Sequence, residues 1–111
     1  MKNASAARAS SDPVVPDELI ERAAARFALL ADPTRLRLVS ALHLHGEGSV
    51  GALAGVAGIS VANASQHLNR LATGGVVGRR REGTSVRYRI VDDSIEQLCH
   101  LVCEALGEDP R

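Results

Sequence analysis

Residues 58–77, GISVANASQHLNRLATGGVV, decide the fold of this chain, and the basic run Arg79, Arg80 and Arg81 follows almost at once. A glycine turn leads to Ser60, a helix-capping residue, and then to an amphipathic segment with a polar outer face. Two adjacent glycines end that segment and introduce a stretch in which apolar and polar residues alternate. This order predicts a recognition helix for duplex DNA with a β-hairpin wing behind it.

The predicted recognition helix, about residues 61–73, has one apolar and one polar face. Ala64, Leu68 and Leu71 recur at helical spacing and predict its buried stripe, and His67 lies close enough to this stripe that we expect it to pack. The residues on the opposite face and its flanks are Ala62, Asn63, Ser65, Gln66, Asn69 and Arg70. None of them is Asp, Glu or Lys, although exposed helix faces usually carry such charges, so the pattern favours DNA over plain solvent.

Polar residues of this helix are the candidates for direct DNA contact. We expect Gln66 and Asn63 to pair with base edges, since amide side chains present both a donor and an acceptor. Ser60 and Ser65 suit phosphate or base contacts, and Arg70 flanks them. Small side chains on the same face let the helix enter the major groove.

The stretch after the glycine pair predicts a two-stranded hairpin over residues 76–91. Its arginines, which we expect to add salt-dependent affinity for phosphates, are Arg79, Arg80, Arg81 and Arg87. Arg79 and Arg81 fall on one face of the strand and Arg80 on the other, so no more than two of these three serve the same groove.

Charge is distributed unevenly along the chain, although its 13 basic and 13 acidic residues cancel. Residues 63–91 hold six arginines and one acid, whereas residues 92–111 hold six acids and one arginine. This segregation predicts one face for a polyanion and another for a protein partner or cations.

Caps, glycine stops and the three-to-four spacing of apolar residues predict four further helices. Their approximate bounds are 17–30, 33–44, a short segment between Ser49 and Gly58, and 93–106. The fold class is therefore mainly α with a β-hairpin wing, a winged helix-turn-helix of five helices and one two-stranded hairpin. We expect one domain over residues 17–107, a disordered arm at 1–16 and a flexible tail at 108–111.

The apolar composition predicts a homodimer. With one Phe, one Tyr and no Trp, a core built from Leu, Val, Ile and Ala leaves little surplus stability, so we expect two copies to share apolar surface. The first helix supplies Leu19, Ile20, Phe27 and Leu30 at helical spacing. The short third helix holds Val50, Leu53, Ala54 and Val56.

Several function classes are disfavoured. The chain shows no secretory signal and no apolar run long enough to span a bilayer, which predicts a cytoplasmic protein without a membrane partner. Two cysteines are too few for a disulfide framework. An enzyme is not expected, because Cys99 and His100 have no third group to orient them.

Three stretches and one residue carry a resemblance to a known family. They are ADPTRLRLVSAL (31–42), SVANASQHLNRL (60–71), GGVVGRRREGTSVRYRI (74–90) and Asp92. Together they resemble the ArsR/SmtB family of bacterial repressors over about residues 19–106. The resemblance implies a dimer joined through the first and last helices, an operator with imperfect twofold symmetry, and an inducer that lowers DNA affinity. It places base contacts at Ala62, Ser65 and Gln66, while Thr84 replaces the basic residue that relatives often carry at the wing tip.

The resemblance also locates three kinds of metal site, none of which this chain completes. The thiol pair of the third helix falls on Ser49, Val50 and Gly51, and the cysteine site of the fourth helix falls on Arg70 and Gly74. The four ligand positions of the last helix read Asp92, Ser94, Ala105 and Glu108. Only the two carboxylates among these can coordinate a metal.

Cys99, His100 and Cys103 on the last predicted helix form the candidate effector site instead. Spacings of three and four place thiol, imidazole and thiol on neighbouring turns, which suits a transition metal of borderline softness such as Zn(II), Ni(II) or Co(II). Water, Asp92 or a group of the second subunit could supply a fourth ligand. We expect Ni(II) or Zn(II) as the effector.

Other interpretations of this helix stay open. The cysteines could form a redox-sensitive thiol pair, although Glu96 and Glu104 disfavour the low thiol pKa that this requires, or pack as small apolar side chains. The chain could also act through a co-encoded regulatory protein docked on the acidic last helix. His43 and His45, two positions apart, point away from each other and are expected to be solvated.

Overall fold

The computed structural model describes residues 14–107, so the predicted tail at 108–111 and most of the predicted arm at 1–16 lie outside the described residues. Five helices are present in that part of the chain, as the sequence predicts. They are α2 (Asp17–Leu30), α3 (Pro33–His45), α4 (Val50–Ala57), α5 (Val61–Thr73) and α6 (Asp93–Gly107). The strands are β1 (Gly48–Ser49), β2 (Val77–Glu82) and β3 (Ser85–Ile90).

Side-chain caps fix where three of the helices begin. Each capping oxygen accepts a hydrogen bond from a backbone N–H of the first turn, which would otherwise have no partner within the helix. The side-chain oxygen of Asp32 accepts from the N–H of Arg35 at the start of α3 (N–O distance 2.9 Å). The hydroxyl of Ser49 accepts from Ala52 in α4 (3.2 Å), and that of Ser60 accepts from Asn63 in α5 (3.0 Å). Helix α4 ends at Gly58, whose φ of 70° lies in the left-handed region that glycine adopts without strain.

The sheet has three antiparallel strands in the order β1–β3–β2, which corrects the two-stranded hairpin expected from the sequence. Strands β2 and β3 form that hairpin, and β1 adds Gly48 opposite Tyr88 and Ser49 opposite Arg87. A strand of two residues is too short to show an alternating pattern, so periodicity does not reveal it. Glycine also fits here because a Cβ at Gly48 would lie 2.9 Å from the side chain of Leu53.

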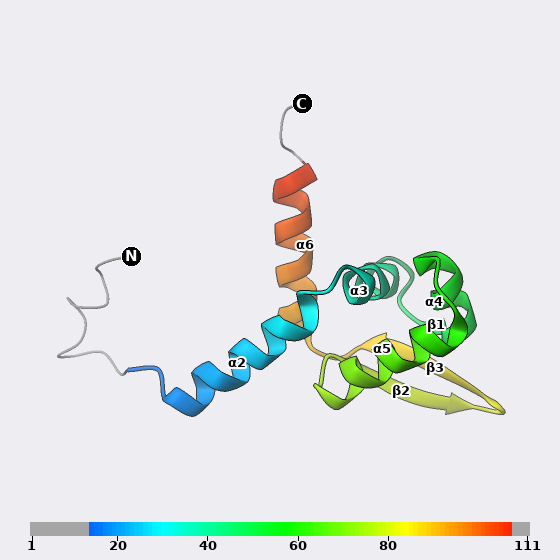
Figure 1. Ribbon diagram of the computed structural model, residues 1–111, viewed down its shortest axis with the longest axis horizontal. Coiled ribbons are helices and arrows are strands. Elements are labelled where there is room, and N and C mark those ends of the chain that lie inside the picture. Colours follow the sequence, from blue (N-terminus) through cyan, green and yellow to red (C-terminus); the bar gives the residue numbers. More distant parts are fainter. Residues whose placement is uncertain (1–13, 108–111) are drawn as a thin grey trace.

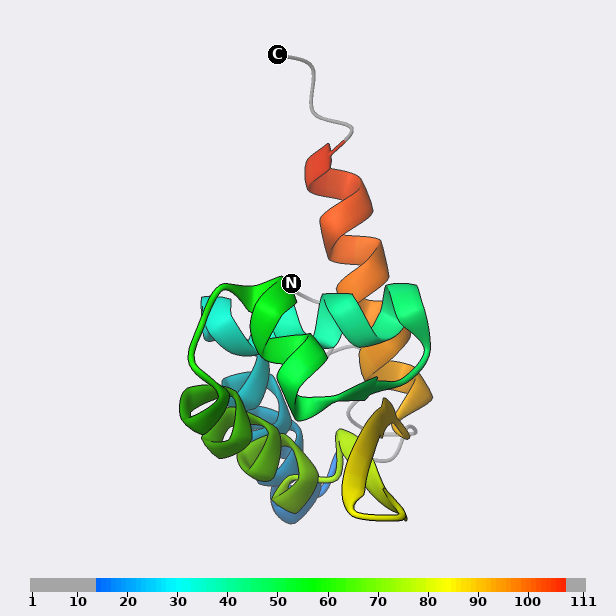
Figure 2. The ribbon, with the colours of Figure 1, turned by 90° about the vertical axis from the view of Figure 1, so that its right-hand side faces the viewer.

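The core surrounds α3, which contacts α2, α4, α5, β3 and α6 (Figures 1 and 2). The largest fully buried side chains are Leu38, Val39, Leu42, Leu68, Leu71 and Val76. Three of these belong to α3 and two to α5, so the recognition helix rests on the inner face of α3. Burying one such side chain contributes about 1.5–3 kcal/mol, so this contact and the packing of α4 against α5 together hold α5 in place.

Helices α2 and α6 extend away from this core in different directions (Figure 1). Only Leu30 of the predicted apolar stripe of α2 is buried; Leu19, Ile20 and Phe27 are exposed, because no other part of the described chain packs against that side. Helix α6 buries Ile95 alone. Its exposed apolar residues are Leu101, Val102 and Leu106. Two apolar helix faces are therefore left uncovered in the single chain.

Val56, one of the apolar residues of α4, is 59% exposed. The buried face is centred between Leu53, Ala54 and Ala57, and at about 100° per residue Val56 is turned roughly a quarter of a circle away from it. No helix within residues 14–107 is both long and apolar enough to cross a bilayer.

Candidate nucleic-acid interface and effector site

The outer face of α5 carries the residues predicted to contact DNA. The exposed members are Ser60, Ala62, Asn63, Gln66 and Arg70. Ser65 is half-buried and offers less of its hydroxyl to a groove than the sequence suggests. On the inner face Ala64, Leu68 and Leu71 are fully buried, which confirms the predicted stripe. The polar face of the helix is thus open to a ligand while its apolar face is fixed by the core.

His67 packs against α3, in line with the expectation from its position near the stripe. Its Nδ1 lies 3.3 Å from Nη1 of Arg35, and the Nε–H of Arg35 donates to the carbonyl of Leu29 at 2.7 Å. Arg35 therefore connects the start of α3 with both α2 and α5. No pattern in the sequence predicts this role, because Arg35 and His67 are 32 positions apart along the chain.

One hydrogen bond joins the wing to the recognition helix. Nη1 of Arg79 donates to Oδ1 of Asn69 at 2.9 Å, so the start of β2 is connected to the outer face of α5. In the strand register Arg79 lies opposite Tyr88 and Arg81 opposite Val86. Arg79 and Arg81 thus share a face of the strand and Arg80 lies on the other, as the alternation predicts.

Arg80 and Arg87, which pair across the hairpin, both bind Glu47. Oε1 of Glu47 lies 2.7 Å from Nη2 of Arg80 and 3.2 Å from Nε of Arg87. Hydrogen bonds from Arg87 and Arg80 lower the pKa of Glu47, and Glu47 in turn raises the pKa of Arg80. Part of the positive charge predicted to face DNA is therefore balanced within the chain, by an acid that precedes β1.

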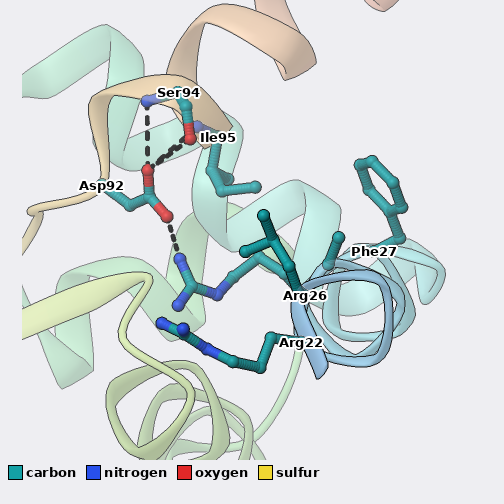
Figure 3. Close-up of a pocket in the computed structure, with 8 residues that line it drawn as sticks. Arg22, Arg26, Phe27, Asp92, Ser94 and Ile95 are labelled. Atoms are coloured by element: carbon teal, nitrogen blue, oxygen red, sulfur yellow. Dashed lines mark hydrogen bonds and ion pairs between the residues drawn. The ribbon is translucent and has the colours of Figure 1, made fainter. Parts of the chain in front are cut away.

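Asp92, one of the predicted metal ligands, has its own partners in the structure. It caps α6: its Oδ1 accepts from the hydroxyl of Ser94 at 2.6 Å and from the backbone N–H of Ser94 at 3.1 Å. Its other oxygen accepts from Nη1 of Arg26. Figure 3 shows Arg26 reaching from α2 to this carboxylate, with Arg22 beside it, across a pocket of about 260 Å³. Both oxygens of Asp92 therefore have partners within the protein.

The electrostatics of Asp92 follow from these bonds. The hydrogen bond from the Ser94 hydroxyl has the largest effect on the carboxyl group, and together with the backbone N–H of Ile95 and the charge of Arg26 it lowers the pKa of Asp92. A carboxylate with such partners is ionised across the neutral range and holds α2 and α6 together.

Cys99, His100 and Cys103 line one side of a cavity of about 200 Å³ between α3 and α6. Cys99 is half-buried, whereas His100 and Cys103 are exposed, and both cysteines are free thiols. Burial, followed by the neighbouring Cys103, raises the pKa of Cys99, which disfavours the alternative of a reactive low-pKa thiol pair. Within residues 14–107 no three His, Cys, Asp or Glu side chains already stand together in the manner of a bound metal.

His43 lines the same cavity from α3, although the sequence predicts it as a solvated side chain. It is exposed, but its Nδ1 lies 2.7 Å from Oε2 of Glu96 and its ring centroid lies 5.4 Å from that of His100. Periodicity carried a signal for this: His43 follows Val39 by four positions, on the side of α3 that faces inward. His45 is exposed at the end of the helix.

Comparison with known proteins gives the chain its family. A helix-turn-helix domain model matches residues 30–80. The chain is 37% identical to the HTH-type transcriptional regulator Rv0324 of Mycobacterium tuberculosis over 76% of its own length, but spans only 37% of that relative. It is 36% identical to a probable mercury resistance operon repressor of Streptomyces lividans, with 91% of this chain and 80% of the relative covered.

Solved structures agree with these relatives. The homodimeric winged helix-turn-helix DNA-binding domain of Mb0332 from Mycobacterium bovis superposes with a TM-score of 0.75 at 33% identity, covering 87% of this chain and 92% of that one. The relatives are regulators of transcription and not enzymes, as the sequence predicts. The chain belongs to the ArsR/SmtB family of winged helix-turn-helix transcriptional regulators.

Proposed function

We propose that this chain is a homodimeric, sequence-specific DNA-binding repressor whose operator affinity is set by a transition metal bound beside its last helix. The observation that carries the DNA-binding part is the outer face of α5. It is exposed and polar, holds no acid, and is joined through Asn69 to a wing that carries three consecutive arginines. A surface of this kind suits the major groove and its flanking phosphates.

The dimer is inferred from the uncovered faces of α2 and α6. An almost wholly apolar groove of about 280 Å³ runs between them, with Phe27, Leu30, Leu98, Val102 and Leu106 among its lining residues. A second copy of this chain is the occupant that we propose, since the related Mb0332 domain is a homodimer with the same fold. Two recognition helices related by a twofold axis then read half-sites about one helical turn of DNA apart.

Direct contacts are assigned to the residues that lie on this surface. We propose base contacts for Ala62, Asn63, Ser65 and Gln66. Phosphate contacts are proposed for Ser60, Arg70, Arg79, Arg80, Arg81 and Arg87. Arginines on the wing supply affinity that falls with salt, whereas the amides of α5 supply sequence preference.

The effector is proposed to be Ni(II) or Zn(II) bound by Cys99, His100 and Cys103. Two thiols and an imidazole on neighbouring turns of α6 are donors that such ions prefer, and they face a cavity with room for an ion. A relative is named for mercury resistance, which supports a metal as the class of effector. By linkage, metal and DNA change each other's affinity by the same factor.

The test is fluorescence anisotropy of a labelled operator fragment with reduced protein, with and without Zn(II) or Ni(II). We expect the metal to weaken operator binding in the wild type by about fivefold or more. The double variant Cys99→Ser, Cys103→Ser should bind the operator and ignore the metal. Unchanged affinity in the wild type with either metal would refute metal control while leaving the DNA-binding assignment intact.

Docking of a co-encoded regulatory protein on the acidic face of α6 stays an alternative prediction. It requires weak operator binding by the purified chain and recovery of binding when the partner is added.

A further inference from the structure

We propose that the metal site is shared by two helices, with His43 of α3 as a fourth protein ligand beside Cys99, His100 and Cys103 of α6. The inference rests on the proposed metal effector. It specifies how binding of that ion to α6 would affect the recognition helix α5. The sequence separates His43 from the other three residues by more than 50 positions, so only the folded chain brings them together.

The first support is the placement of the four side chains around one cavity. His43, Cys99, His100 and Cys103 all line the space of about 200 Å³ between α3 and α6, together with Val39, Ser40 and Leu44. The rings of His43 and His100 are 5.4 Å apart and inclined by 43°, so the two imidazoles already approach each other from opposite helices.

The second support is that each imidazole has a carboxylate beside one of its nitrogens. Nδ1 of His43 lies 2.7 Å from Oε2 of Glu96, and because an ionised carboxylate only accepts, this nitrogen carries the proton. Nε2 of His43 is then the nitrogen with a lone pair for a metal. Nε2 of His100 lies 3.7 Å from Oε1 of Glu104, which is too long for a hydrogen bond, so both ring nitrogens of His100 are candidate ligand atoms. Histidines that bind metals commonly donate their other N–H to a carboxylate, as His43 does.

The donor set fits the proposed ion. Two thiolates and two neutral imidazoles form the Cys₂His₂ set that holds tetrahedral Zn(II), with bond lengths of about 2.3 Å to sulfur and 2.0–2.1 Å to nitrogen. Within residues 14–107 these side chains do not yet converge at such distances, so binding has to rotate them inward. His43, His100 and Cys103 are exposed, so side-chain rotation is open to each of them.

A shared site explains how the ion would affect DNA binding. His43 lies near the end of α3, whereas Arg35 near its start contacts His67 of the recognition helix. A metal held by α6 alone would bind only the helix that extends from the core. A metal that also binds His43 fixes α6 against the helix on which α5 rests.

The experiment is a Co(II) titration of the reduced, full-length protein, followed by competition with Zn(II) for affinity. The variants are His43→Gln and, as a matched control at the same helix end, His45→Gln. We expect wild type and His45→Gln to show thiolate-to-Co(II) charge transfer and the intense ligand-field bands of a tetrahedral ion. His43→Gln should keep the charge-transfer band, lose the tetrahedral pattern and bind Zn(II) at least tenfold more weakly. Glu96→Gln should retain the tetrahedral pattern and lose about tenfold in affinity.

The outcomes separate this inference from the function on which it rests. Wild-type affinity and spectrum in His43→Gln would overturn the shared site and leave the metal on α6. Absence of any thiolate-to-Co(II) band in the wild type would refute the metal effector itself, and with it the shared site. Thermal unfolding of each variant by circular dichroism shows whether a loss of binding reflects a loss of fold.

Discussion

Arg26 of α2 donates to the carboxylate of Asp92, the residue that caps α6, and so joins two helices whose ion-paired residues are 66 positions apart. Both helices leave apolar faces uncovered, so this contact helps to set the angle between them. In the proposed dimer these are the helices that meet the second subunit. The angle that the Arg26–Asp92 ion pair sets between α2 and α6 therefore affects the distance between the two recognition helices of the proposed dimer.

Asp92→Ala should lower the free energy of unfolding at pH 7 by about 1–2 kcal/mol, through loss of the cap and of a partly exposed ion pair. The pKa of Asp92 is lowered in the folded chain, above all by Ser94, so its stabilisation is complete above the ordinary carboxyl pKa of about 3.9 and is lost as the pH falls through the lower folded value. Urea unfolding at fixed protein concentration across this range measures the difference. Asp93→Ala, at the exposed next position, is the control, and equal stability of Asp92→Ala and wild type at pH 7 would contradict the prediction.

Glu47→Gln should strengthen binding to duplex DNA, because it releases Arg80 and Arg87 from their shared carboxylate. The slope of log K against log salt should steepen by up to about one unit for each arginine that gains a phosphate. Glu21→Gln on α2 makes the same change in net charge away from the wing. An equal effect of both substitutions would show that overall charge, and not these two arginines, is responsible.

Gln66→Ala should weaken binding to the operator by about 1–3 kcal/mol and relax the preference at one base pair in each half-site. Binding to an unrelated duplex should change little, since phosphate contacts dominate there. Gln97→Ala on α6 serves as the matched control. Equal loss on both duplexes would assign Gln66 to the backbone instead.

Val102→Glu should convert the proposed dimer to a monomer, because it places a charge in the apolar groove between α2 and α6, where Val102 is 50% exposed in the single chain. Sedimentation equilibrium at micromolar concentration measures the mass. Val56→Glu changes a side chain of similar exposure on α4 and should leave the dimer intact. A monomeric wild type would rule out the interface altogether.

Local signals in the sequence were enough to place the helices. Ser60 caps α5 as predicted, Asp32 and Ser49 cap α3 and α4, and the apolar stripe of α5 is buried as expected. The polar face of that helix followed from the same periodicity. These features depend on residues within one or two turns, which is the range over which patterns report reliably.

Contacts between distant segments could not be predicted in the same way. Strand β1, which pairs Gly48 with Tyr88, is too short to show an alternating pattern in the sequence. The ion pairs of Glu47 with the wing join surface charges, and the sequence does not indicate which opposite charge each one binds. Asp92 is a predicted metal ligand because the family resemblance places a ligand position there, whereas its bond to Arg26, 66 positions away, leaves no pattern in the sequence. The spacing of His43 from Val39 indicates which side of α3 it occupies, but does not reveal its neighbours Glu96 and His100 on α6.

Helix α3 touches the candidate sensor through His43 and the recognition helix through Arg35, eight residues or about 12 Å away along its axis. The side chains between these contacts that build the core are Leu38, Val39 and Leu42, whereas the sensor side chains lie at or near the surface. Single substitutions can therefore change the side chains of the candidate sensor while the buried residues of α3 stay the same. Regulators with this fold can therefore change their inducer specificity while they keep their operator specificity.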